Sequence, residues 1–248
     1  MAAATAVTSP SRDTLERVRR FYGLPFADAE VIPNPGPEVA AQDCWSLASC
    51  ERLALLFVGR FDRLKGGDVV VDAFREIATE FAAARLIFVG PEPGLSDGSG
   101  RTVDLATYLA SSVPEAEIRA RIEVAGPLPP DAIAELRKRA FITVVPSRYE
   151  TFSMTVVEAL AQGCPVVAAD AGGMPEVLRD GENGRLFHAG NARDLAARLR
   201  EMFADPVAAE AMGRRARVDY LERFAPAVVA RRMAEFYRKV VGGRHPTR

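Results

Sequence analysis

This 248-residue sequence has few histidines, few cysteines and almost no net charge, and each of these features argues against a class of function. The two histidines, His188 and His245, have no catalytic partner near them in the sequence. The three cysteines lack the paired spacing of a zinc site. With 32 basic and 33 acidic residues the net charge is −1 and no basic block occurs, so nucleic acid is not expected as an electrostatic partner.

Long apolar runs and two common nucleotide-binding signatures are also missing. No apolar run approaches the roughly 18 to 20 residues that span a bilayer, and the first ten residues lack the charged region and apolar core of a secretion signal. We therefore expect a cytoplasmic protein with at most peripheral membrane contact. Neither G-x-G-x-x-G after a strand nor the P-loop G-x-x-x-x-G-K-[ST] occurs, which argues against an NAD enzyme and a P-loop NTPase.

The cysteines are expected to be structural rather than catalytic. Cys164 lies in an apolar turn and is predicted to be a small packing residue. Cys44 and Cys50 are predicted to be free thiols, and the sequence leaves a disulfide between them open as the alternative.

What the sequence does contain is a regular alternation of apolar strands and amphipathic helices after residue 50. This alternation indicates a parallel sheet that helices cover on both faces. The predicted fold class is therefore α/β, a doubly wound, Rossmann-like sheet with extra C-terminal helices. The predicted strands cover residues 53–58, 85–90, 121–124, 140–145, 165–169 and 184–187, and the closing helices cover 191–203, 207–224 and 226–241.

The regions on either side of this alternation are predicted to be less regular. Residues 1–10 are expected to be disordered, and 11–50 to form a helix capped by Ser11 followed by a proline-rich linker. The doubly wound domain with its closing helices is predicted to cover residues 51–241. Residues 242–248 are then a tail.

The most informative segment is PSRYETFSMTVVEALAQGCP, residues 146–165, which follows a predicted strand. It places Glu150 in the loop at the strand's C-terminal end and Glu158 on the second turn of the next helix. The first turn of that helix presents free backbone N–H groups and the positive end of the helix dipole. A ligand that carries phosphate and hydroxyl groups suits this place. The alternative is an ordinary amphipathic helix whose Glu158 faces solvent.

A basic loop follows the strand predicted at 53–58, where ligands of open parallel sheets bind. Gly59 allows close approach to the backbone. Arg60 offers a bidentate guanidinium to phosphate oxygens, and Lys65 adds a mobile ammonium charge. An ordinary solvated basic loop is the alternative.

Two further strand ends carry weaker candidates. Gly172 and Gly173 follow the strand at 165–169 and are expected to admit a bulky ligand beside the backbone. Glu176 is expected to favour the N-terminus of its own helix. The segment 126–130, Gly-Pro-Leu-Pro-Pro, is a candidate surface for a flat base.

Taken together, these segments resemble the retaining glycosyltransferases of family four. The motifs that carry the resemblance are Gly59-Arg60 with Lys65-Gly66, Pro146-Ser147, Glu150 and Glu158 in E-x-x-x-x-x-x-x-E spacing, Gly172-Gly173-x-Pro-Glu176, and Asn183-Gly184. They occur in the family's order, and the resemblance covers roughly residues 15–241. It implies the GT-B fold, in which two Rossmann-like domains face each other across a cleft. This chain would be the C-terminal, nucleotide-sugar-binding half.

The resemblance also implies a role for each residue. Arg60 and Lys65 would grip the donor diphosphate in place of a metal, and Glu150 would contact the transferred sugar, so these three form the predicted catalytic set. Glu158 would accept hydrogen bonds from the ribose hydroxyls. The remaining predicted donor contacts are the backbone of Phe152, Ser153, Met154 and Thr155, together with Gly59, Gly172 and Gly173. Ser153 stands where the family most often has glycine, so its hydroxyl is expected to crowd or hydrogen-bond the phosphate.

The expected ligand is a UDP-, GDP- or ADP-linked sugar that serves as the donor substrate, with no metal or other cofactor. Transfer is expected to need an N-terminal GT-B half or a partner protein. The sequence leaves three alternatives open. These are a non-catalytic half that binds nucleotide sugars or a protein partner, another GT-B activity such as a sugar phosphorylase or nucleotide-sugar epimerase, and a generic doubly wound scaffold.

Overall fold

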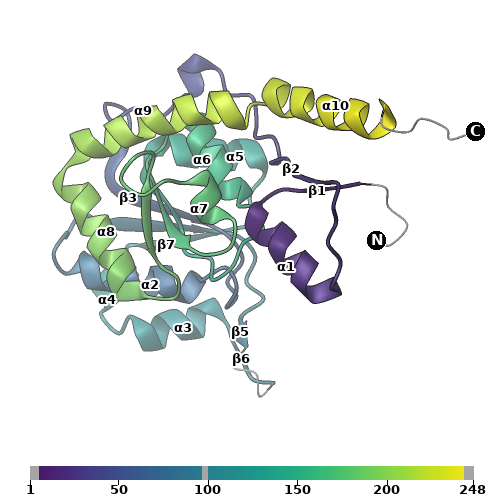
Figure 1. Ribbon diagram of the computed structural model, residues 1–248. Coiled ribbons are helices and arrows are strands. Elements are labelled where there is room, and N and C mark those ends of the chain that lie inside the picture. Colours follow the sequence, from purple (N-terminus) through teal and green to yellow (C-terminus); the bar gives the residue numbers. More distant parts are fainter. Residues whose placement is uncertain (1–5, 97–99, 243–248) are drawn as a thin grey trace, which may run out of the picture.

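A computed structural model describes residues 6–96 and 100–242, and a six-stranded parallel sheet forms its centre (Figure 1). The strands lie in the order β10, β9, β8, β3, β4, β7. Their bounds are β3 (Glu51–Val58), β4 (Arg85–Val89), β7 (Ile122–Gly126), β8 (Ala140–Val145), β9 (Val166–Asp170) and β10 (Arg185–His188). The predicted α/β class and the predicted strands are confirmed.

The direction of winding reverses beside β3. From β3 the chain proceeds to β4 and β7 on one side, and it then returns to β8, β9 and β10 on the other. Loops after two neighbouring strands diverge at such a switch point, and ligands of doubly wound sheets bind there. The loops that follow β3 and β8 are therefore the ones that matter for function.

Helices cover both faces of the sheet, as the alternation predicts (Figure 1). On one side α2 packs against α8 and α3, and on the other α5 and α6 pack against the strands. Their bounds are α2 (Gly67–Ala78), α3 (Leu105–Ser112), α4 (Ala116–Arg119), α5 (Pro130–Arg139), α6 (Met154–Gln162), α7 (Met174–Val177), α8 (Ala192–Ala204), α9 (Pro206–Arg223) and α10 (Pro226–Gly242).

The central strands are apolar along their whole length because both of their faces are buried. On the face that carries α2, the rings of Phe57 and Phe88 pack against each other at a tilt, with their centroids 4.5 Å apart. Their neighbours Leu56 and Ile87 point to the other face, where Ile133 of α5 packs against them. Successive side chains of a strand thus serve two separate clusters.

The N-terminal segment is more ordered than predicted. Residues Val7–Ser9 form a strand, β1, which pairs in parallel with β2 (Ala29–Val31), so the expectation of disorder through residue 10 is wrong. Residues 1–5 lie outside the described part. Ser11 caps helix α1 (Arg12–Tyr22) by accepting a hydrogen bond from the Thr14 amide, as predicted. Helix α10 lies over this unit and buries Val229 and Phe236 against Ile32 (Figure 1).

Part of the predicted linker is instead anchored to the domain. Trp45 follows a short 3-10 turn (Ala41–Asp43) and is buried. Its indole N–H donates to the Ala140 carbonyl at 2.7 Å, and its amide donates to the Gln162 carbonyl at 2.8 Å. An aromatic side chain fixed in this way adds apolar burial to the core, which the proline-rich composition of the segment did not indicate.

A short hairpin follows β4. Strands β5 (Leu95–Ser96) and β6 (Thr102–Val103) form an antiparallel pair, and helix α3 begins after them at Leu105, with Asp104 as its N-cap. No described helix is long and apolar enough to cross a membrane.

The cysteines are free thiols, so the alternative of a disulfide between Cys44 and Cys50 is wrong. Cys164 is fully buried, and this burial raises the pKa of its thiol to about 11. It is the packing residue that the sequence indicated.

Candidate functional site

The loops that follow β3 and β8 are in direct backbone contact at the switch point. The Arg148 amide donates to the Leu64 carbonyl at 2.8 Å. Gly66 has a φ of 71°, and a Cβ atom there would lie 2.2 Å from the Pro146 carbonyl oxygen. Only glycine fits this contact, which holds the two loops at a fixed separation.

This contact brings two predicted site residues together. The Lys65 ammonium lies 2.5 Å from Oε1 of Glu150, and the Ser147 hydroxyl donates to the same oxygen at 2.9 Å. The Glu150 side chain is 14% exposed and that of Lys65 is 31% exposed, so the pair is partly shielded yet open to a ligand. A cation and a carboxylate 85 positions apart in the sequence thus form one group.

Arg60 lies on the same loop as Lys65, but its side chain pairs with a different carboxylate. Its guanidinium pairs with Oδ2 of Asp62 at 2.7 Å, and its side chain is 54% exposed. The other carboxylate oxygen of Asp62 accepts from the Lys65 amide at 2.7 Å. Asp62 therefore organises the loop that carries both cations, a role that sequence reasoning missed although the residue lies between them.

Gly172 and Gly173 lie against the backbone of the loop that carries Glu150. A Cβ atom at Gly172 would lie 2.1 Å from the Glu150 carbonyl oxygen, and the Gly173 amide donates to the same oxygen at 2.8 Å. On the side where a Cβ atom would lie, the space at Gly172 is therefore filled by the Glu150 loop. Their contact with a donor stays a prediction.

Ser153 and Phe152 are both turned inward at the start of α6. The Ser153 hydroxyl accepts from the Val156 amide at 3.4 Å and caps the helix. Ser153 is 2% exposed, so the expectation that its hydroxyl crowds a phosphate is wrong. The Phe152 ring packs against Phe224 with centroids 6.0 Å apart.

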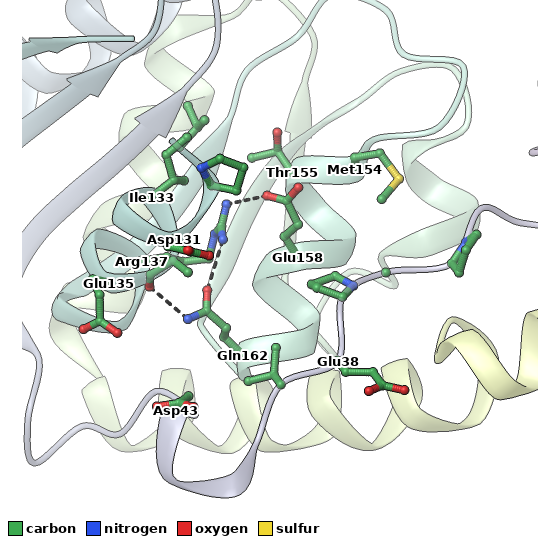
Figure 2. Close-up of a pocket in the computed structure, with 17 residues that line it drawn as sticks. Glu38, Asp43, Asp131, Ile133, Glu135, Arg137, Met154, Thr155, Glu158 and Gln162 are labelled. Atoms are coloured by element: carbon green, nitrogen blue, oxygen red, sulfur yellow. Dashed lines mark hydrogen bonds and ion pairs between the residues drawn. The ribbon is translucent and has the colours of Figure 1, made fainter. Parts of the chain in front are cut away.

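Next to these loops lies a cavity of about 760 Å³, which Figure 2 shows from close by. It begins at Val58, the last residue of β3, and runs between α5, α6 and the segment 35–39. Its apolar wall includes Ile133 and Met154. The charged residues that line it are Glu38, Asp43, Asp131, Glu135, Arg137 and Glu158.

The cavity includes a second group of predicted site residues. Met154, Thr155 and Glu158 line it, all on the first turns of α6. Pro130, from the segment that we expected to face a flat base, lies on the opposite wall at the start of α5. Glu158 therefore lies on the wall of a cavity, and its contact with a donor stays a prediction.

Glu158 has a partner that sequence reasoning did not find. Arg137 of α5 reaches across to α6, and its Nη2 lies 2.7 Å from Oε2 of Glu158 (Figure 2). Its Nη1 donates to Oε1 of Gln162 at 3.0 Å. Glu158 and Gln162 are four residues apart on α6 and so share one side of the helix, which is the signal that could have suggested a common partner.

The start of α1 is bound to the loop after β8 and to α7. The backbone amides of Arg12 and Asp13 donate to the two carboxylate oxygens of Glu176 at 2.8 and 2.9 Å. Ser11 donates from its hydroxyl to the Thr151 carbonyl at 2.6 Å. Glu176 thus stabilises the N-terminus of α1, 163 positions away, rather than that of its own helix alone.

Comparison with known proteins decides the family. The profile described as "Glycosyl transferases group 1" matches residues 47–219. The chain belongs to this family. Its α/β fold, a six-stranded parallel sheet flanked by helices, matches structures of GT-B glycosyltransferases.

Individual relatives agree with this assignment. The D-inositol 3-phosphate glycosyltransferase of Nocardiopsis dassonvillei is 34% identical over 203 residues, which is 78% of this chain and 46% of that protein. The enzyme of that name from Corynebacterium aurimucosum is 33% identical over 236 residues, which is 95% of this chain and 49% of that protein. This group 1 glycosyltransferase chain therefore spans about half the length of the curated relatives it matches.

Solved structures show the same fold at lower identity. Anabaena HepE in complex with UDP aligns with a TM-score of 0.78 at 21% identity, over 95% of this chain and 64% of that chain. Sucrose-phosphate synthase from Thermosynechococcus elongatus aligns with a TM-score of 0.74 at 23% identity, over 96% of this chain and 59% of that chain.

Proposed function

We propose that this chain is the nucleotide-sugar-binding half of a retaining glycosyltransferase. The observation that carries the proposal is the arrangement at the switch point. A lysine–glutamate pair and the start of a helix stand beside a cavity, and a second glutamate, Glu158, lines that cavity. Family membership supports the same function, because group 1 members are glycosyl transferases by description.

The parts of a nucleotide-diphosphate sugar match these groups in order. The nucleoside fits the cavity, where Ile133, Met154 and Pro130 offer apolar surface to the base and Glu158 accepts from the ribose hydroxyls. The diphosphate then reaches Lys65 and the first turn of α6, where an ammonium and free backbone N–H groups favour negative charge. Glu150 is left for the hydroxyls of the sugar.

The proposed roles of the basic residues follow from the negative charge that develops on the diphosphate during transfer. In the transfer, the bond between the anomeric carbon and the diphosphate oxygen breaks, and the electron pair leaves with the diphosphate. A new bond forms to an acceptor hydroxyl oxygen, whose proton is released. Lys65, with Arg60 once it leaves Asp62, would stabilise the charge that grows on the departing diphosphate. Retention of the anomeric configuration rests on the family-four resemblance.

The acceptor is expected to be held by a second half. The curated relatives are about twice as long as this chain, and they are named for transfer to D-inositol 3-phosphate. Two aromatic residues at the end of α1, Phe21 and Tyr22, are 82% and 51% exposed and give apolar surface for a neighbouring domain. We therefore propose that transfer needs an N-terminal half or a partner protein, with inositol phosphate as the first acceptor to assay.

Donor binding is the experiment that tests the proposal. Isothermal titration calorimetry with UDP, GDP, ADP and UDP-glucose is expected to give saturable heat for at least one of them, since Anabaena HepE has been solved with UDP and with UDP-glucose. Substitution Lys65→Met should weaken that binding by roughly 10- to 150-fold, the equivalent of about 1.5–3 kcal/mol.

The matched control is Lys239→Met, which makes the same change on the exposed last turn of α10. Its affinity should equal that of the unsubstituted protein. If no nucleotide binds, or if both lysine substitutions weaken binding alike, the donor site does not lie at the switch point.

A further inference from the structure

We propose that Arg137 is a positioning residue. It fixes the carboxylate of Glu158 for the donor ribose and thereby makes the site prefer ribonucleotides to 2′-deoxyribonucleotides. This inference rests on the proposed function and adds to it a residue outside the predicted site.

The first observation is the burial of the guanidinium. The Arg137 side chain is only 3% exposed, and an arginine is rarely buried unless hydrogen-bonded anionic or polar groups compensate its charge. Here Glu158 supplies the charge and Gln162 a second acceptor. Gln162 is itself held, because its amide nitrogen donates to the Ala134 carbonyl at 2.9 Å. The guanidinium is thus fixed from behind by α5 and α6 together.

The second observation is that the two carboxylate oxygens of Glu158 differ in their hydrogen bonding. Its Oε2 lies on Arg137, while its Oε1 makes no hydrogen bond to any residue of the described ranges 6–96 and 100–242. The Glu158 side chain is 36% exposed, and the residue lines the cavity (Figure 2). Arg137 therefore holds one oxygen and leaves the other available to a ligand hydroxyl.

The third observation is the charge around the cavity. Four other carboxylates line it, at Glu38, Asp43, Asp131 and Glu135, and Lys138 pairs with Asp43 at 3.3 Å. Of the described residues that line the cavity, Arg137 is the only basic one. Without it, repulsion from the neighbouring carboxylates would favour rotation of the Glu158 side chain out of the cavity.

A carboxylate in a fixed position can accept from both neighbouring hydroxyls of a ribose, whereas a mobile one does so only part of the time. A site built around a substrate hydroxyl rejects the analogue that lacks it, because the protein acceptor is then left unpaired. The preference for ribose over 2′-deoxyribose therefore measures the placement of Glu158. This preference is a ratio of two affinities measured on the same protein, so the overall stability of the chain does not enter it.

The experiment compares the affinities of UDP, GDP and ADP with those of their 2′-deoxy counterparts by calorimetry. We expect a preference of at least about tenfold for the ribonucleotide. In Arg137→Met this preference should fall to less than about threefold, and Arg137→Lys should restore part of it. The control Arg179→Met removes ion pairs to Asp219 and Glu182, which do not line the cavity, and should keep the full preference.

Two further variants complete the test. In a Glu158→Gln background, adding Arg137→Met should not lower the preference again, because both changes act through one carboxylate. Gln162→Met removes the support of the guanidinium but leaves its contact with Glu158. It should lower the preference at least about twofold, and it replaces Arg137→Met if that variant does not fold.

The outcomes separate this inference from the proposed function. If the unsubstituted protein binds ribo- and deoxyribonucleotides equally, or if Arg137→Met and Gln162→Met retain the full preference, the inference is wrong while donor binding stands. If no nucleotide binds at all, both are wrong.

Discussion

Replacement of Glu158 by glutamine tests the centre of the proposed donor site. Glutamine has almost the same shape, and its carbonyl oxygen can still accept from the Arg137 guanidinium, which in the native chain lies 2.7 Å from Oε2. What is lost is the negative charge. The variant should keep the fold with a lower free energy of unfolding, because the buried Arg137 retains a hydrogen bond but loses its charged partner. Its hydrogen bonds to ribose hydroxyls become neutral ones.

The expected decrease in nucleotide affinity follows from the loss of this negative charge. Hydrogen bonds to a charged group contribute about 1.5–3 kcal/mol and neutral ones about 0.5–1.5 kcal/mol, a difference of about 1–1.5 kcal/mol. This corresponds to a roughly tenfold weaker affinity for the nucleotide. Glu158→Ala removes the acceptor altogether and should weaken binding roughly 10- to 150-fold. It should also lower the free energy of unfolding more than Glu158→Gln does, because the buried Arg137 then loses the hydrogen bond as well as the charge.

Calorimetric titration with the nucleoside diphosphate that binds best measures both variants. Glu135→Gln is the matched control, since it makes the same chemical change at another carboxylate of the same cavity. If Glu158→Gln binds with unchanged affinity, or if Glu135→Gln is impaired as strongly, Glu158 is not the ribose ligand.

Three other predictions concern the fold that supports the site. Gly172→Ala should lower the free energy of unfolding by about 1–3 kcal/mol more than Gly23→Ala does. Both glycines have positive φ, but only at Gly172 would a Cβ atom meet backbone. Equal losses of stability in urea denaturation would contradict the close approach at Gly172. A thiol reagent near neutral pH should modify Cys164, whose burial raises its pKa to about 11, only after denaturation, while the other two cysteines react in the native protein. Burial raises the pKa of Asp72, so its ionised form opposes folding, and Asp72→Asn should raise the Tm at neutral pH while still accepting from Tyr108. That gain should shrink as the pH falls and the native Asp72 takes up its proton, and a gain independent of pH would refute this assignment.

Much of the secondary structure could be predicted because its causes are local. Apolar runs bounded by glycine and proline predict β3, β4, β8 and β9, and the structure has strands at all four places. Ser11 was recognised as the cap of α1 because a hydroxyl before an amphipathic run satisfies a free amide of the first turn. The error at residues Val7–Ser9 arose because a strand of three residues carries too little pattern, and its partner β2 lies more than twenty positions away.

The candidate site was predictable in part, for a similar reason. Loops at the carboxyl ends of parallel strands must meet at one edge of the sheet, so Lys65 and Glu150 were expected near each other and lie 2.5 Å apart. The position of Arg60 was not predictable in this way, because Asp62 on the same loop competes for its guanidinium. A sequence pattern gives the place of a long side chain but not its hydrogen-bond partner.

The sequence by itself determined the α/β alternation, the family resemblance and the loops in which function should lie, because these depend on periodicity and on glycine, proline and charge at fixed spacing. Only the tertiary structure decided which surfaces those loops present. It filled the space beside Gly172 with the Glu150 backbone, anchored Trp45 in the domain and set Arg137 behind Glu158. Such contacts join residues that are distant in the chain, and their energy depends on burial and geometry that exist only once the elements have packed.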